Sequence, residues 1–303
     1  MARIRATHIT DPGCPFAYGG EALVSTLRWR FGEQIDWRLV MIGLAEDPSE
    51  YEDRGYTAEW MTQAWLGFRD TGMPFTMAPR SRVIATGRAC RVVVAARLES
   101  PVLATRVLRA LRFGWFTTTM LLDEDEALRS LLETIPGADA DFLIDRIDDQ
   151  EVEAAYQRDR AEARTAAGSP SEAQGKARDG RYTAPTLIFE ADERRLEAGG
   201  SQPLAAYDAL IANLDPALER RPPAATAVEA VEAFDHGLTT REVALIMADS
   251  EPDDRAAAAE LIQYAAEERI ACVPIGSDAL WVPATSGPFE RLRRVRELVS
   301  LDG

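Results

Sequence analysis

The residue best placed to do chemistry is Cys14, which stands between a strand pattern and a helix pattern near the N-terminus. Residues 4–9 alternate with period two, as in a buried strand, and residues 21–31 carry apolar side chains at helical spacing. Pro15 fits the first position of a helix, because the N–H that it lacks would have no intrahelical partner there. A thiol at this point faces unpaired backbone N–H groups and the positive end of the helix dipole. The sequence therefore predicts a lowered thiol pKa and nucleophilic or redox chemistry.

A proline before an apolar strand pattern is the second feature that could serve a site. Residues 182–189 read Tyr-Thr-Ala-Pro-Thr-Leu-Ile-Phe, so Pro185 stands at the start of a predicted strand. Proline lacks the N–H that a sheet ladder needs and is typical of the first residue of a strand or of an edge strand. By itself this pattern indicates a structural edge-strand proline with no further function.

Together the two features resemble the DsbA-like thioredoxin superfamily. The phrase from Asp11 to Tyr18 is similar to its Cys-Pro-x-Cys active site, and within it to the branch of FrnE-type oxidoreductases, 2-hydroxychromene-2-carboxylate isomerases and kappa-class glutathione transferases. Residues 81–91 and 108–116 resemble helices of the same family. Ala17 stands where the family has its second, resolving cysteine. This Cys-x-x-Ala motif excludes a dithiol–disulfide cycle confined to the motif.

The resemblance implies a thioredoxin fold over residues 1–215, with a helical insertion at about 57–177. It also implies a cis peptide bond before Pro185. The residue before that proline, Ala184, is then expected to offer its backbone N–H and C=O to an extended substrate. The implied catalytic residue is Cys14. The implied substrate-binding residues lie beside it in the fold: Pro15, Phe16, Ala17, Ala184 and Pro185.

One active-site cysteine leaves three kinds of function. We expect thiol–disulfide exchange, in which the Cys14 thiolate attacks a mixed disulfide of a protein or metabolite and a second small thiol resolves it. The resemblance also implies an alternative, a pocket that binds a thiol cofactor of the glutathione or mycothiol type for a transferase or isomerase reaction. The third is a catalytically inactive domain that binds a peptide or small molecule. No tightly bound cofactor and no metal are expected, because the chain has no Cys-x-x-Cys pair and only two histidines.

The remaining elements complete an α/β chain around this site. A strand at 35–44 follows the helix at 21–31 and makes a parallel pair with the first strand. The expected insertion consists of helices at 57–71, 81–98, 101–116, 123–135, 140–147 and 149–167. A hairpin at 187–198 and a helix at 203–214 close the unit, and Asp123 is expected to cap the fourth helix of the insertion.

Residues 226–303 show a different pattern after a proline-containing linker. We expect two helices at 239–247 and 253–269, two strands at 270–275 and 280–282, and a final helix at 289–298. This order of elements is that of a winged helix. Such a module can bind DNA, but acidic residues outnumber basic ones in it, and the basic cluster is confined to the last helix. We therefore expect a small winged-helix-like α+β domain that serves protein–protein contact, homodimerisation or closure over the site.

Composition and charge limit the partners. The chain has 303 residues, and 34 basic against 50 acidic residues give a net charge of −16. Nucleic acids and anionic membrane surfaces require clustered positive charge, so neither is expected as a partner. No apolar run reaches the ~20 residues that span a bilayer, and the chain begins with a strand instead of a signal peptide. We expect a soluble cytoplasmic protein with reduced thiols.

Other candidate residues are expected to be structural. Cys90 and Cys272 lie in apolar runs, so we expect them to be buried, inert and unable to resolve Cys14. His8 in the first strand is expected to be a core histidine rather than a partner of Cys14. Five aromatic residues form the core of the helical insertion or wall an apolar cleft over Cys14: Trp60, Trp65, Phe68, Trp115 and Phe116.

Overall fold

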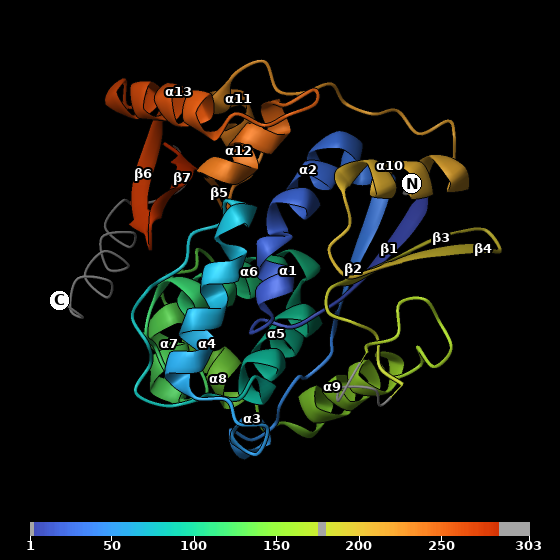
Figure 1. Ribbon diagram of the computed structural model, residues 1–303, viewed down its shortest axis with the longest axis vertical. Helices are drawn as coiled ribbons and strands as arrows, with labels where there is room; N and C mark the ends of the chain where they lie inside the picture. The colour runs from blue at the N-terminus through green and yellow to red at the C-terminus, as the bar shows by residue number, and fades with distance from the viewer. Residues whose placement is uncertain (1–2, 175–179, 285–303) are drawn as a thin grey trace.

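The computed structural model describes residues 3–174 and 180–284, and a four-stranded sheet lies at the centre of the first two-thirds of the chain (Figure 1). The strand order is β2-β1-β3-β4. The central strand β1 pairs in parallel with β2 and antiparallel with β3, and β3 continues into the hairpin strand β4. The strands span Ile4–Thr10, Ile35–Met41, Thr186–Ala191 and Arg194–Gly199.

The register of the sheet brings the two sequence motifs to one place. Ile9, near the end of β1, pairs with Thr186, the first residue of β3. Because the two strands are antiparallel, the loop that leaves β1 and the peptide that enters β3 lie at the same end of the sheet. Cys14 and Pro185 are therefore neighbours, although 170 residues separate Cys14 from Ala184.

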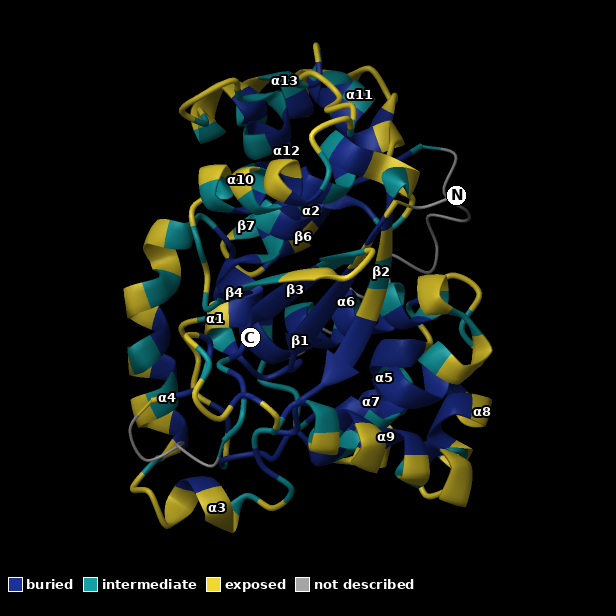
Figure 2. Cartoon of the chain, turned by 90° about the vertical axis from the view of Figure 1, so that its right-hand side faces the viewer, coloured by how far each residue is buried: buried dark blue, intermediate teal, exposed yellow. Residues whose placement is uncertain are grey.

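Helices α2 (Glu21–Phe31) and α10 (Leu204–Leu214) cover one face of this sheet (Figure 2). Their apolar side chains share one buried cluster with Ile4 and Phe189 of the strands. The opposite face buries Ile9 and its neighbours in a second cluster, which also contains Cys14. Because both faces are covered, every residue of β1 except Arg5 is buried.

A block of helices is inserted between β2 and β3, as expected. It contains α3, α4, the 3-10 helix η2, and α5 to α9. All of these except α3 contribute to one large apolar core, whereas Tyr51 of α3 lies in a separate small cluster. Their bounds are Ser49–Glu52, Ala58–Trp65, Leu66–Thr71, Gly87–Glu99, Pro101–Thr117, Asp125–Leu132, Ala140–Asp145 and Gln150–Glu162. Among the residues with described positions, no helix is both long and apolar enough to cross a bilayer.

Two details of the insertion differ from the prediction. The helix expected from residue 81 begins at Gly87, because Arg80 and Arg82 turn instead toward the ends of other helices. Asp123 does not cap α7, whose N-cap residue is Glu124 without a side-chain cap bond. The carboxylate of Asp123 is occupied by two hydrogen bonds from Arg82, at 2.6 and 2.8 Å.

The C-terminal unit has its own three-stranded sheet, with the order β5-β7-β6. Its elements α11, β5, α12, α13, β6 and β7 span Ala227–Glu232, Leu238–Thr239, Thr240–Met247, Asp254–Ala266, Ile270–Ile275 and Asp278–Pro283. Helix α12 lies against α2, and Trp29 of α2 belongs to the buried cluster of this unit (Figure 1). The winged-helix assignment and the domain boundaries stay predictions, and the helix predicted at 289–298 lies outside the described residues.

Candidate functional site

Cys14 is the N-cap residue of the short helix α1 (Pro15–Gly19), and Pro15 occupies the first helical position. The thiol of Cys14 lies 3.3 Å from the carbonyl oxygen of Ala184 and donates a hydrogen bond to it. The peptide bond between Ala184 and Pro185 is cis. The structure thus brings together the cysteine and the proline motif that the sequence singled out.

The expectation of a lowered thiol pKa is wrong for this structure. Cys14 is only 4% exposed, and burial raises the pKa of its thiol to about 11. The backbone N–H groups of Ala17 and Phe16 lower this pKa, as expected at a helix start, but burial outweighs them. A hydrogen bond from the thiol to a carbonyl oxygen also requires the proton to stay on sulfur. The resting thiol of Cys14 is therefore protonated at neutral pH.

The residues around Cys14 differ sharply in exposure. Phe16 is 58% exposed and makes an edge-on ring contact with Phe68, with ring centroids 4.7 Å apart. Ala17, Ala184 and Pro185 are buried, so Ala17 fills the place of a second cysteine with a packed methyl group. Phe16 is thus the side chain of the motif that a partner would meet first.

The aromatic residues of the insertion are mostly core. Trp65, Trp115 and Phe116 are buried in the large cluster of the helical block. Trp60 is 49% exposed and stacks on Tyr56, with ring centroids 4.5 Å apart. The core interpretation therefore applies to the buried three, although Trp65 and Trp115 also line a small hollow at the edge of this core.

Asp11 shapes the loop of Cys14, although sequence reasoning assigned it no role. Its carboxylate accepts hydrogen bonds from the backbone N–H groups of Gly13 at 2.9 Å and Leu44 at 3.0 Å, and from Thr86 Oγ1 at 3.1 Å. Burial raises the pKa of this carboxyl group, while these donors lower it. The Asp-Pro-Gly sequence, which is typical of a side-chain-stabilised turn, was the signal that could have identified it.

The two other cysteines have different surroundings. Cys90 is fully buried and lies 3.5 Å from an Asp11 carboxylate oxygen, and burial raises the pKa of its thiol well above the usual range. Cys272 is exposed, which corrects the prediction that it is buried. It lies on β6, the edge strand of the small sheet, where alternate residues of an apolar-looking run point outward.

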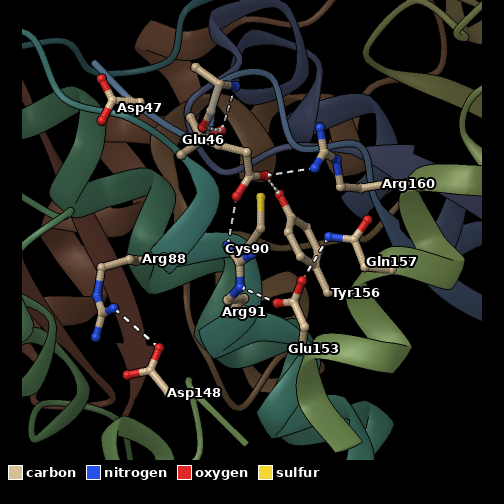
Figure 3. A network of polar contacts seen from close by, with 12 residues as sticks. Glu46, Asp47, Arg88, Cys90, Arg91, Asp148, Glu153, Tyr156, Gln157 and Arg160 are labelled. Carbon is tan, nitrogen blue, oxygen red and sulfur yellow. Dashed lines mark hydrogen bonds and ion pairs between the residues drawn. The ribbon is translucent and has the colours of Figure 1, made fainter. Parts of the chain in front are cut away.

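A polar network lies beside Cys90 and fixes the segment that follows β2 (Figure 3). Arg91 donates to Glu46 at 2.8 Å and to Glu153 at 2.7 Å, and the hydroxyl of Tyr156 also donates to Glu46. These residues come from α5, α9 and the segment after β2, so the network ties the three together. The network therefore fixes the segment after β2 against α5 and α9.

A chain of buried charges, also missed from the sequence, runs from the end of β1 to the C-terminal unit. Arg112 of α6 donates to Thr10 Oγ1 and forms an ion pair with Glu21. One turn earlier, Arg109 lies 4.0 Å from Glu21 and makes two hydrogen bonds to Glu242, at 2.7 and 2.6 Å. The available signal was the spacing of three arginines on this helix, Arg106, Arg109 and Arg112, at intervals of three residues among mostly apolar neighbours.

This chain of charges also acts on the thiol. Arg112 lowers the pKa of Cys14, although by less than burial raises it. His8 is buried in β1, and its Nε2 has no hydrogen-bond partner in the described part of the chain. Burial is the first cause that lowers the pKa of His8 and the charge of Arg112 the second, so His8 is a neutral core residue, as expected.

Comparison with known proteins gives matches in structure only. No protein-family model matches the chain, and no curated protein matches it in sequence. A protein described as a putative disulfide isomerase from Nitrosomonas europaea matches with a TM-score of 0.55 at 17% identity, over 70% of this chain and 97% of that one.

Two further solved structures have the same arrangement. The cytosolic disulfide reductase DsbM from Pseudomonas aeruginosa matches with a TM-score of 0.51 at 18% identity, over 68% of this chain and 98% of that one. A probable DsbA oxidoreductase from Streptomyces coelicolor matches with a TM-score of 0.53 at 18% identity, over 73% and 92%. At these identities the matches report on fold, and they show that the first two-thirds of the chain has the DsbA-like thioredoxin fold.

Proposed function

We propose that the chain is a thiol–disulfide oxidoreductase that exchanges disulfides through the single cysteine Cys14. The observation that carries this proposal is the contact between the Cys14 thiol and the carbonyl oxygen of Ala184, the residue before a cis proline. In this arrangement a nucleophile and an extended backbone segment that can pair with a substrate lie side by side. Ala17 offers no second sulfur, so the resolving thiol must come from outside the motif.

The proposed reaction has two balanced exchange steps. The Cys14 thiolate attacks one sulfur of a substrate disulfide, which forms a mixed disulfide with Cys14 and releases the other sulfur as a thiolate. A low-molecular-weight thiolate then attacks the substrate sulfur of the mixed disulfide, which regenerates the Cys14 thiolate and leaves the substrate joined to the small thiol. Each step breaks one S–S bond and forms one, so no other oxidant or reductant is needed.

Because the thiol is buried and protonated, substrate binding must promote the ionisation of Cys14 before the exchange can occur. A pKa of about 11 leaves about one thiolate in ten thousand at pH 7. A substrate backbone N–H that binds the carbonyl oxygen of Ala184 would take the acceptor away from the thiol. The hydrogen bond that stabilises the protonated thiol would then be lost. The helix N-terminus and Arg112, both of which lower the thiol pKa, would shift the equilibrium toward the thiolate. Docking and ionisation are coupled in this proposal.

The identity of the small thiol rests on a structural neighbour. The Pseudomonas aeruginosa protein is described as cytosolic and as a disulfide reductase, and a structure of it with GSH matches this chain with a TM-score of 0.50 at 17% identity. This likeness supports glutathione as the co-substrate and a cytoplasmic location for this chain, and a mycothiol-type thiol stays the alternative that the sequence resemblance implies.

A second candidate function is favoured by the protonation state of Cys14. A neutral thiol is a hydrogen-bond donor, and the branch of the superfamily that the sequence resembles includes enzymes that use a bound thiol cofactor. In that function Cys14 would donate to the sulfur of the cofactor and would not form a covalent bond. The chain would then be a thiol-cofactor-dependent transferase or isomerase.

Intact-mass spectrometry separates the two candidates. The full chain carrying Cys90→Ser and Cys272→Ser is incubated with glutathione disulfide, and the same chain with Cys14→Ser serves as the control. The exchange proposal predicts one glutathione adduct on Cys14, its release by reduced glutathione, and no adduct on the control. Non-covalent glutathione binding that persists in the Cys14→Ser chain, without any adduct on Cys14, would favour the cofactor function instead.

A further inference from the structure

The segment that holds Cys14, residues 11–20, is fastened at both ends by one side chain of α6, Arg112. Its Nη2 donates a hydrogen bond to Thr10 Oγ1, directly before the segment, and its Nη1 forms an ion pair with Glu21, directly after the segment. Arg112 and Thr10 are fully buried, and the side chain of Glu21 is 14% exposed. One guanidinium group therefore holds the two ends of the Cys14 segment together.

The next turn of α6 supports the middle of the same segment. Trp115 follows Arg112 by three residues, and a Cβ atom added to Gly13 would lie only 2.9 Å from the Trp115 ring. The face of α6 that carries both side chains thus lies directly against the Cys14 segment. From this position the cation of Arg112 lowers the pKa of the Cys14 thiol, whereas the carboxylate of Asp11, on the segment itself, raises it.

The other titratable groups around the thiol are neutral at pH 7. Burial lowers the pKa of His8 on β1 well below its usual value. Burial also raises the pKa of Tyr51 on α3 and of Cys90 on α5 well above their usual values. Asp11 and Arg112 are therefore the charged groups that act most strongly on the thiol, and any change in the net charge at Arg112 should alter its ionisation.

Glu21, the counter-ion of Arg112, is shared with a second arginine. Arg109, one turn earlier on α6, lies 4.0 Å from the Glu21 carboxylate and makes two hydrogen bonds to Glu242 of α12, at 2.7 and 2.6 Å. Glu242 also accepts a hydrogen bond from Ser25 Oγ at 2.7 Å, so it joins α12 to α2, against which α12 lies (Figure 1). Two carboxylates balance two guanidinium groups in this cluster. How Glu21 divides between the two arginines therefore depends on Glu242.

We propose that Arg112 is a positioning residue of the Cys14 site, and that Glu21 and Glu242 set how strongly its charge acts on the thiol. This inference rests on the proposed exchange function, because it concerns the same thiol. While Glu242 binds Arg109, Glu21 is left to Arg112 and offsets its charge. Loss of the Glu242 charge would draw Glu21 toward Arg109 and leave more of the Arg112 charge to stabilise the thiolate. The C-terminal unit, which supplies Glu242, thereby restrains the reactivity of Cys14.

The rate at which iodoacetamide alkylates Cys14 at pH 9 tests this proposal, on the full chain with Cys90→Ser and Cys272→Ser. The reagent is neutral, so the rate follows the thiolate fraction, which at this pH changes about tenfold for each unit of the thiol pKa. Glu21→Gln should raise the rate at least about threefold, and Arg112→Gln should lower it at least about threefold, because each changes the pKa by about half a unit or more. A purely structural role predicts a faster reaction in both variants, since a loosened segment exposes the thiol.

Two further substitutions test the part played by the C-terminal unit. Glu242→Gln should raise the rate, in the same direction as Glu21→Gln. Asp235→Asn is the matched control, because it also removes a carboxylate of the C-terminal unit that pairs with an arginine of α6, Arg106, but this pair is more exposed and does not include Glu21. It should leave the rate unchanged. If Arg112→Gln does not fold, as circular dichroism would show, Arg112→Lys keeps the charge and should react at a rate close to that of the parent chain.

Three results would overturn the proposal. They are a folded Arg112→Gln or Arg112→Lys chain that reacts clearly faster than the parent chain, a Glu21→Gln chain that reacts no faster, and an equal response to Glu242→Gln and Asp235→Asn. Alkylation requires no disulfide, so this test is independent of the adduct expected with glutathione disulfide. An adduct together with the wrong direction of these rates would refute this inference alone. The expected directions without an adduct would refute the exchange function and leave the electrostatic coupling in place.

Discussion

Glu242 is predicted to be one of the largest single contributors to stability in this chain. It is fully buried and accepts hydrogen bonds from both Nη atoms of Arg109, from Ser25 Oγ at 2.7 Å and from the backbone N–H of Thr239 at 2.7 Å. These donors come from α6, α2 and the C-terminal unit, so one carboxylate joins three parts of the fold. Glu242→Gln removes the negative charge with almost no change in shape.

The expected magnitude follows from the pKa of this carboxyl group. Burial alone would raise the pKa of Glu242, but Arg109, Thr239 and Ser25 together lower it to about 2. Against about 4.3 for an unfolded chain, a shift of about 2 units corresponds to about 3 kcal/mol of folding stability. Because the folded pKa is the lower one, this stability is present above about pH 4.3 and is lost as the pH falls toward 2. Leaving Arg109 buried without a partner gives a similar figure, about 3–5 kcal/mol.

Urea unfolding at pH 7, followed by tryptophan fluorescence, measures this effect in the full chain. Asp254→Asn is the matched control, because it likewise replaces the carboxylate of an arginine–carboxylate pair by an amide, in this case Arg241–Asp254 at 2.9 Å. That pair is at the surface and should contribute less than about 1 kcal/mol. A loss below about 1 kcal/mol in Glu242→Gln would refute the reasoning. The double variant Arg109→Leu/Glu242→Leu should recover only part of the loss, since it leaves no unpaired charge in the interior but removes the acceptor of the Thr239 N–H and the Ser25 hydroxyl.

Three further predictions concern the Cys14 loop and the other cysteines. Gly13→Ala should destabilise the chain by about 1–3 kcal/mol in urea unfolding, because the added Cβ would lie 2.6 Å from Thr86 Cγ2 and 2.9 Å from the Trp115 ring. An unchanged unfolding midpoint would contradict this packing. Iodoacetamide at pH 8 should label Cys272 first and both Cys14 and Cys90 slowly, as peptide mass spectrometry would show; equal labelling of all three would mean that the thiols are not buried as described. Phe16→Ala should change the unfolding midpoint little, because the side chain is 58% exposed, but should slow the reaction of Cys14 with a disulfide-linked peptide; an unchanged rate would remove Phe16 from the substrate surface.

Helices and strands were predictable from the sequence where the spacing of apolar residues and the flanking turn residues indicated the same element. The helix Glu21–Phe31 and the hairpin from Thr186 to Gly199 follow directly from apolar spacing and turn residues. The start of α5 was not predictable in this way. Residues 81–86 were assigned to the helix although three of the six, Val83, Ile84 and Thr86, are β-branched and are poor helix formers. In addition, Arg82 forms an ion pair with Asp123 across the insertion, and that distant contact is absent from any local window.

The site was predictable in position but not in its electrostatics. The strand, the cysteine and the proline indicated that Cys14 and Pro185 would meet, and the register of β1 and β3 brings them together. The sign of the thiol pKa shift depends on how deeply the sulfur lies, and a motif does not report depth. The same limit applies to Arg112, whose partner Thr10 is 102 residues away along the chain, and in part to Asp11, which binds the nearby Gly13 but also Leu44, 33 residues away.

The most direct test of the central claim is the rate of reaction of Cys14 with glutathione disulfide as a function of pH. It is measured on the full chain with Cys90→Ser and Cys272→Ser, so that Cys14 is the one thiol present. Our account predicts a mixed disulfide at Cys14 and a rate that rises about tenfold per pH unit between pH 7 and 9.5, because the thiolate fraction rises tenfold per unit below a pKa of about 11. No adduct at any pH would contradict the proposed exchange, and a rate that is already constant above pH 7 would contradict the buried, protonated thiol.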